Sequence, residues 1–243
     1  MSTIAIVGAG PQLGRAIAHR FAREGFDVAL IARSRTTLEK MVVELTETGV
    51  RAAAFPADVT DRPGLRDALA AAEDHFGTID VLEYSPGPSP ADFAARPIVE
   101  ASQLTVESIV AEMEMYVYGG VTAVGQVLPG MLRRGRGTIL ATTGAGSGPM
   151  IVPEVANVQV ATAGLRNFIL NLHASVAERG VYAAHVALGA FIGQGSPKSE
   201  PDVIADAYWR LHQERSESEL FYLDLPDDYV FEGVSPQFLS EGE

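Results

Sequence analysis

The feature that most constrains the fold is a strict alternation of short apolar segments with longer segments of helical periodicity. The apolar segments fall at 4–7, 28–31, 52–55, 79–82, 138–142, 182–187 and 219–223. Between the first two, Leu13, Ile17 and Phe21 recur every four residues, as on one face of a helix. Strands buried on both faces are continuously apolar. The alternation therefore predicts one doubly wound α/β domain, with a seven-stranded parallel sheet and helices on both faces.

The predicted helix boundaries and loops support one domain rather than two. Long helices are predicted at 105–134 and 157–179, and Asp61 is a predicted N-cap for a helix with Pro63 in its first turn. The proline-rich stretch 86–90 is predicted to be a loop. We assign 1–225 to the domain and 226–243, which has acidic side chains and no lysine or arginine, to an acidic C-terminal tail.

Composition excludes several classes of function. The net charge of −13 argues against a nucleic-acid partner, because such proteins carry a basic face. The chain has no cysteine, and its five histidines have no metal-ligand spacing, so no metal is expected. No apolar run approaches the roughly 18 residues that span a membrane. Without a basic leader segment before its first apolar stretch, the chain is expected to be cytoplasmic.

A glycine-rich turn between the first strand and the first helix predicts dinucleotide binding. Gly8 can make the tight turn, the helix start can bind a pyrophosphate, and Gly14 allows close packing. The second strand ends in Arg33 and Ser34 rather than an acid, which favours the 2′-phosphate of NADP(H) over NAD. The residues of the turn expected to contact cofactor are Gly8, Gly10, Pro11, Gln12, Leu13 and Gly14.

Across about residues 3–223 the chain resembles the short-chain dehydrogenase/reductase family, which has a Rossmann fold. Val7, Gly8 and Gly14 fall on the family's turn, Thr-Gly-x-x-x-Gly-x-Gly, although Gln12 replaces its middle glycine. Further similar segments follow in the family's order and spacing. They are 28–33, 57–60, 80–82, 128–131 and 163–168.

The resemblance implies further cofactor contacts. Asp58 would hold the adenine amino group and Val59 would cover the ring. The segment 84–87 stands where the family has Asn-Asn-Ala-Gly, and 188–189 where it has Pro-Gly. The residues that the resemblance adds to the cofactor site are thus Asp58, Val59, Ser85, Gly87, Leu188 and Gly189.

The resemblance ends at the chemistry. Family members use a Tyr as acid and base, a Lys four residues later, a Ser that polarises the substrate and an Asn that anchors a water relay. Here the corresponding positions are Val158, Thr162, Gly144 and Tyr116. None of the seven tyrosines is followed four residues later by Lys or Arg. Since a phenol titrates near ~10 without a nearby cation, the usual acid is missing.

Three hypotheses remain. The first is a protein that binds NADP(H), with a small-molecule ligand, and has little or no activity by the usual route. The second is an NADPH-dependent carbonyl reductase with Tyr116 or water as proton donor. Tyr84, at a strand end near the expected nicotinamide ribose, is a further candidate, and Lys198 could swing in to supply the missing cation. The third is a structural relative that has lost the cofactor, which Gln12 favours. Family members assemble through the two long helices, which implies a homodimer or homotetramer.

Overall fold

The computed structural model describes residues 2–148, 150–194, 196–226 and 229. Within them, one seven-stranded sheet has the order β3-β2-β1-β4-β5-β6-β7, and every neighbouring pair is parallel. The predicted fold class is confirmed. The strands are β1 (Thr3–Val7), β2 (Asp27–Ile31), β3 (Ala52–Ala54), β4 (Val81–Tyr84), β5 (Gly137–Gly144), β6 (Val181–Ala190) and β7 (Glu219–Asp224).

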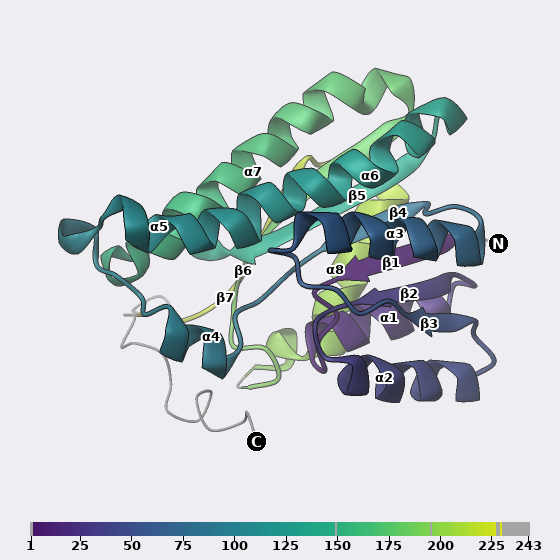
Figure 1. The fold of residues 1–243 in the computed structure, drawn as a ribbon, viewed down its shortest axis with the longest axis horizontal. Helices are drawn as coiled ribbons and strands as arrows, with labels where there is room; N and C mark the ends of the chain where they lie inside the picture. Colours follow the sequence, from purple (N-terminus) through teal and green to yellow (C-terminus); the bar gives the residue numbers. More distant parts are fainter. Residues whose placement is uncertain (1, 149, 195, 227–228, 230–243) are drawn as a thin grey trace.

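Helices cover both faces of the sheet, and each face has its own apolar core (Figure 1). One core joins the sheet to α3 (Arg62–Phe76), α6 (Gly119–Arg134) and α7 (Ala156–Val176), and α5 (Val106–Glu112) packs against α7. The other joins it to α1 (Leu13–Ala22), α2 (Arg35–Glu47) and α8 (Pro201–Glu214). This two-sided burial explains why the strands are apolar throughout rather than alternating.

The predicted helix 105–134 is one long helix with a π-helical segment, Met113–Tyr118, between α5 and α6. The hydroxyl of Tyr84, at the end of β4, donates a hydrogen bond to the carbonyl of Met115 in this segment. A Cβ at Gly119 would collide with the same hydroxyl, so glycine lets the helix lie directly on Tyr84. Tyr84 is therefore buried under the helix, and its predicted place near the cofactor is wrong.

The prediction of a loop at 86–90 is wrong for Pro90, which is the first residue of α4 (Pro90–Ala95). A capping box starts this helix: the Ser89 hydroxyl accepts from the backbone N–H of Asp92, and the Asp92 carboxylate accepts from that of Ser89, at 3.2 and 2.7 Å. The predicted N-cap Asp61 is confirmed, since its side chain accepts from the N–H of Gly64.

Two expectations from the sequence concern the chain as a whole. Of the predicted acidic tail 226–243, only Pro226 and Tyr229 lie within the described residues. In the part of the chain that the structure describes, no helix is both long enough and apolar enough to cross a bilayer.

Candidate functional site

A large cavity, of about 1230 Å³, opens at the carboxyl edge of the sheet. Its walls include the turn after β1 and the chain after β4, the point where the strand order reverses and where open α/β sheets bind ligands. The volume exceeds the roughly 300–1,000 Å³ of an ordinary small-molecule pocket. Every residue that the sequence predicts for the cofactor contributes to its lining: Gly8, Gly10, Pro11, Gln12, Leu13, Gly14, Arg33, Ser34, Asp58, Val59, Ser85, Gly87, Leu188 and Gly189.

The glycine-rich turn has the geometry that a pyrophosphate site requires. Gly8 has a φ of +97°, and a Cβ there would lie 2.5 Å from the carbonyl oxygen of Ser85. A Cβ at Gly14 would lie 3.0 Å from Cα of Ala9, so Gly14 packs against the turn itself. No side chain caps the start of α1 at Gln12, which leaves this helix N-terminus to an anion.

The part of the cavity that the sequence analysis predicts for the adenosine includes residues after β2 and after β3. Ser34 caps α2, its hydroxyl accepting from the N–H of Thr37 at 3.2 Å. The Oδ1 atom of Asp58 accepts from both the N–H and the hydroxyl of Thr60, at 2.9 and 2.8 Å, which fixes this loop. Ser34 and Asp58 thus have structural partners of their own in addition to any contact with a nucleotide.

Arg33 is paired with a residue that the sequence analysis did not single out. Its Nη1 and Nη2 atoms donate to the two carboxylate oxygens of Asp92, at 2.9 and 2.5 Å. Asp92 also lies 3.4 Å from Arg96, which donates to Glu112 at 2.8 Å. These four side chains form a charged row along one side of the cavity, which we call the α4 charge row, with Arg33, Asp92 and Arg96 in the cavity lining.

The positions that the sequence analysis aligns with the family's catalytic residues lie in the wall of the cavity, and neither the tyrosine nor the lysine of the family is present at them. We call this part of the cavity its chemical end. Tyr116, Gly144, Val158 and Thr162, which the sequence analysis assigns to the family's catalytic positions, all contribute to the cavity lining. A side chain at Gly144 would meet open space, whereas the Thr162 hydroxyl donates back to the carbonyl of Val158 at 3.0 Å. The two lysines of the chain, Lys40 and Lys198, are absent from the lining.

Tyr116, the candidate proton donor from the sequence analysis, lines the cavity. Burial raises its pKa above the ordinary range, the Glu112 carboxylate raises it further, and the Arg96 guanidinium lowers it. The raised pKa keeps the phenol neutral and makes it a weaker acid than free tyrosine. Tyr116 can donate a hydrogen bond to a ligand, but its surroundings do not activate it as an acid.

Two buried polar clusters lie beneath the cavity, one on each face of the sheet. In the first, Glu83 accepts hydrogen bonds from Ser85 and Thr142, at 2.8 and 3.1 Å, and Thr142 is bonded to Tyr208 at 2.8 Å. Burial raises the pKa of Glu83 to about 8, although the bonds from Ser85 and Thr142 lower it. Glu83 is thus mainly a neutral carboxyl at pH 7.

The second cluster joins the cavity floor to β7. The Thr143 hydroxyl lies 2.8 Å from Nε2 of His185, whose Nδ1 lies 3.1 Å from Glu219. Burial lowers the pKa of His185 to about 4, so the ring is neutral at pH 7. Arg166 binds the same Glu219 with two nitrogen atoms. Among the described residues, no group of histidine, aspartate and glutamate side chains could hold a metal ion.

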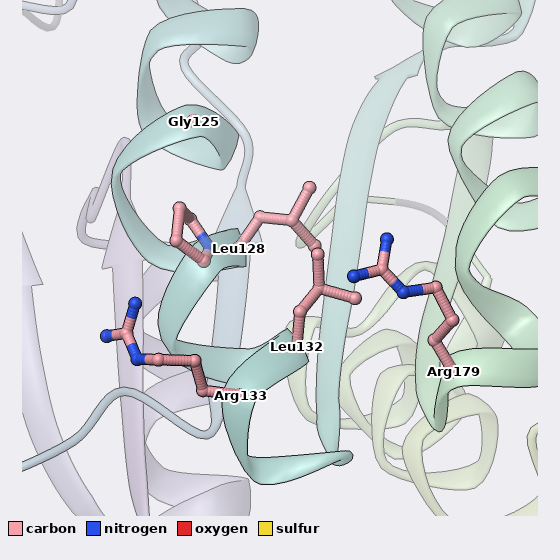
Figure 2. A pocket seen from close by; sticks show the side chains of 6 residues that line it. Gly125, Leu128, Leu132, Arg133 and Arg179 are labelled. Atoms are coloured by element: carbon pink, nitrogen blue, oxygen red, sulfur yellow. The ribbon is translucent and has the colours of Figure 1, made fainter.

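A smaller hollow, of about 510 Å³, lies on the surface between α6 and the short helical turn after α7 (Figure 2). Its wall is formed by Leu128 and Leu132 on one side and by Arg179 on the other. It shares no lining residue with the large cavity, so it is a separate feature of the helical face.

Comparison with known proteins agrees with this geometry. A family model described as short chain dehydrogenase matches residues 2–201. The chain therefore belongs to the short-chain dehydrogenase family. An alcohol dehydrogenase from Thermococcus sibiricus, solved as a complex with 5-hydroxy-NADP, is 26% identical with a TM-score of 0.78, covering 91% of this chain and 95% of its own.

Curated relatives share similar levels of identity over differing lengths. The 2-(S)-hydroxypropyl-CoM dehydrogenase 3 of Xanthobacter autotrophicus is 31% identical over 192 residues, which is 79% of this chain and 72% of the relative. Glycine betaine reductase of Emericella nidulans is 31% identical over 136 residues, which is 56% of this chain and 10% of that much longer protein.

The neutral Glu83 predicts a pH-dependent stability. Between about pH 4.5 and 8 the unfolded chain has released the Glu83 proton that the folded chain retains, so stability falls as the pH rises. Relative to wild type, Glu83→Gln should therefore gain roughly 1–4 kcal/mol of unfolding free energy between pH 5 and pH 8. Urea unfolding at both values measures it, with the exposed Glu39→Gln as control. An equal pH response in both variants would contradict the assignment.

Proposed function

We propose that this chain is an NADP(H)-binding short-chain dehydrogenase relative that does not transfer hydride by the family's Tyr–Lys route. The observation that carries the proposal is one cavity lined by the glycine-rich turn of residues 8–14 and also by Val158 and Thr162. The dinucleotide-binding unit would comprise residues 1–225, with 226–243 as an acidic extension. A small molecule would be the second ligand of the cavity.

The support for a bound dinucleotide comes from the residues at the turn. Gly8 and Gly14 leave room where any Cβ would collide with backbone, and the uncapped α1 can bind a pyrophosphate. Arg33 and Ser34 stand where a 2′-phosphate would lie. The Thermococcus sibiricus relative, whose structure contains 5-hydroxy-NADP, supports the same cofactor class.

A bound nicotinamide dinucleotide would supply the hydride in any redox step. This chain's own residues would bind and orient it and shield it from water. A carbonyl compound in the cavity would face neutral hydroxyls, from Tyr116, Thr143 and Thr162, with no adjacent lysine. Loss of a positioned general acid costs roughly 10²–10⁴ in rate.

The decisive experiment combines binding with turnover. Fluorescence titration should show that NADPH binds. A panel of aldehydes, ketones and quinones should then show no consumption of NADPH above the protein-free rate, because no activated acid lines the cavity. Failure to bind either NADPH or NADH would leave the purely structural hypothesis. Turnover that Tyr116→Phe abolishes would contradict the proposal.

The second candidate is a reductase that uses Tyr116, and one observation favours it. The Arg96 guanidinium stands close enough to Tyr116 to lower its pKa, in the manner of the family's lysine. Two carboxylates, Asp92 and Glu112, already neutralise that guanidinium. The turnover experiment separates the two candidates directly.

Arg33 provides the test of cofactor choice. Arg33→Ala should weaken NADPH binding by at least about tenfold and leave NADH nearly unchanged, because only NADPH carries the 2′-phosphate that a guanidinium binds. Dissociation constants for both nucleotides measure it. Arg35→Ala, at the first residue of α2, exposed and outside the cavity lining, is the matched control. An equal loss for the two nucleotides would contradict a 2′-phosphate site at Arg33.

We also propose a homodimer or homotetramer that associates through the long helices. Val121 on α6 and Val160 on α7 are 44% and 45% exposed, and the hollow in Figure 2 lies on the same helical face. Light scattering should give a mass of at least twice 25.8 kDa. Val121→Asp and Val160→Asp should reduce it to a monomer, whereas Val203→Asp on α8, equally exposed at 44%, should not. A monomeric wild type would contradict this assembly.

A further inference from the structure

We propose that Asp92 is a specificity-determining residue of the dinucleotide site, and that it restrains the preference for NADPH by competing for Arg33. The inference rests on the proposed function, since it needs a dinucleotide in the cavity. It begins from the contact between Arg33, at the end of β2, and α4, which lies 59 residues further along the chain.

The contact uses the same guanidinium geometry that a phosphate would use. Two nitrogens of Arg33 donate to the two oxygens of Asp92, at 2.9 and 2.5 Å, as a fork binds a carboxylate or a phosphate. The hydrogen bond to the Asp92 carboxylate is the largest cause of the raised pKa of Arg33. The fork is thus engaged by an anion from this chain.

Asp92 is fixed in that position by bonds other than the one to Arg33. Its Oδ2 atom accepts from the N–H and the hydroxyl of Ser89, both at 2.7 Å, as part of the capping box of α4. Arg96 lies 3.4 Å from its other oxygen. Asp92 is only 14% exposed, whereas Arg33 is 50% exposed. The carboxylate is therefore the fixed partner and the arginine the adjustable one.

Because of this arrangement, the Asp92 carboxylate would interact differently with the 2′-phosphate of NADPH and with the 2′-hydroxyl of NADH. A 2′-phosphate that reaches Arg33 lies next to the Asp92 carboxylate, and like charges in contact oppose binding. The 2′-hydroxyl of NADH carries no charge and can donate to that carboxylate. Arg33 favours NADPH and Asp92 opposes it, so the preference is the balance of the two residues. Asp58, which also contributes to the charge around Arg33, acts in the same direction as Asp92.

The experiment is a comparison of dissociation constants for NADPH and NADH in wild type and Asp92→Asn. An asparagine can still accept from Ser89, so α4 keeps its cap while the charge is removed. The ratio of the two constants should shift about tenfold or more toward NADPH. Glu114→Gln is the matched control, because Glu114 lines the same cavity without touching Arg33, and its ratio should stay as in wild type.

A double-mutant cycle identifies the partner. In Arg33→Ala the further change Asp92→Asn should shift the ratio less than in wild type, because the competition for Arg33 is gone and only the direct repulsion remains. An equal shift in both backgrounds would show that Asp92 acts without Arg33. Thermal unfolding tests whether each variant is folded. If Asp92→Asn does not fold, Asp92→Ser is a second variant that lacks the charge. An unchanged ratio in a folded variant would overturn the proposal for Asp92 and leave the proposed function intact. If neither wild type nor the folded variant binds a dinucleotide, both fail.

Discussion

The close approach of the turn after β1 to the chain after β4 is the contact on which the rest of the site depends. Gly8, at a φ of +97°, places its Cα where any Cβ would lie 2.5 Å from the Ser85 carbonyl. The N–H groups of Gly8 and Ala9 both donate to the carbonyl of Ile31, at 2.9 and 3.1 Å, which ties the turn to β2 as well. Three strand ends are thereby joined around one point, and the start of α1 is aimed across the cavity.

Much of this could be predicted from the sequence because it follows from local patterns. Continuous apolar segments gave the parallel sheet, and the glycine spacing gave the turn. The errors lie at strand ends, where the deciding factor is pairing rather than composition. β5 runs on to Gly144 because that residue pairs with Leu188 of β6, although neither Thr143 nor Gly144 is apolar. β4 begins at Val81 rather than Ile79, since pairing to β1 starts there.

The α4 charge row was missed for a different reason. The sequence Ser89-Pro90-Ala91-Asp92 is a helix-start signal, with a capping residue, a proline in the first turn and an acid at the third position. The surrounding prolines favoured a loop instead. Even a correct prediction of α4 would not have placed Asp92 against Arg33, because that contact depends on how two distant segments meet above the sheet. Tyr84 was misplaced for the same reason, as only the packing of the helix on β4 shows that it is covered.

The α4 charge row also links the two ends of the cavity. The Arg96 guanidinium is the positive charge that lowers the pKa of Tyr116, and a stronger effect of this kind would be needed for Tyr116 to act as a general acid. Arg96 instead lies between Asp92, at 3.4 Å, and Glu112, at 2.8 Å, and Glu112 itself raises the pKa of Tyr116. The same carboxylates that hold α4 in place therefore withdraw positive charge from the chemical end. Among the described residues that line the cavity, the α4 charge row therefore fixes one wall, and both of its arginines are already paired with carboxylates.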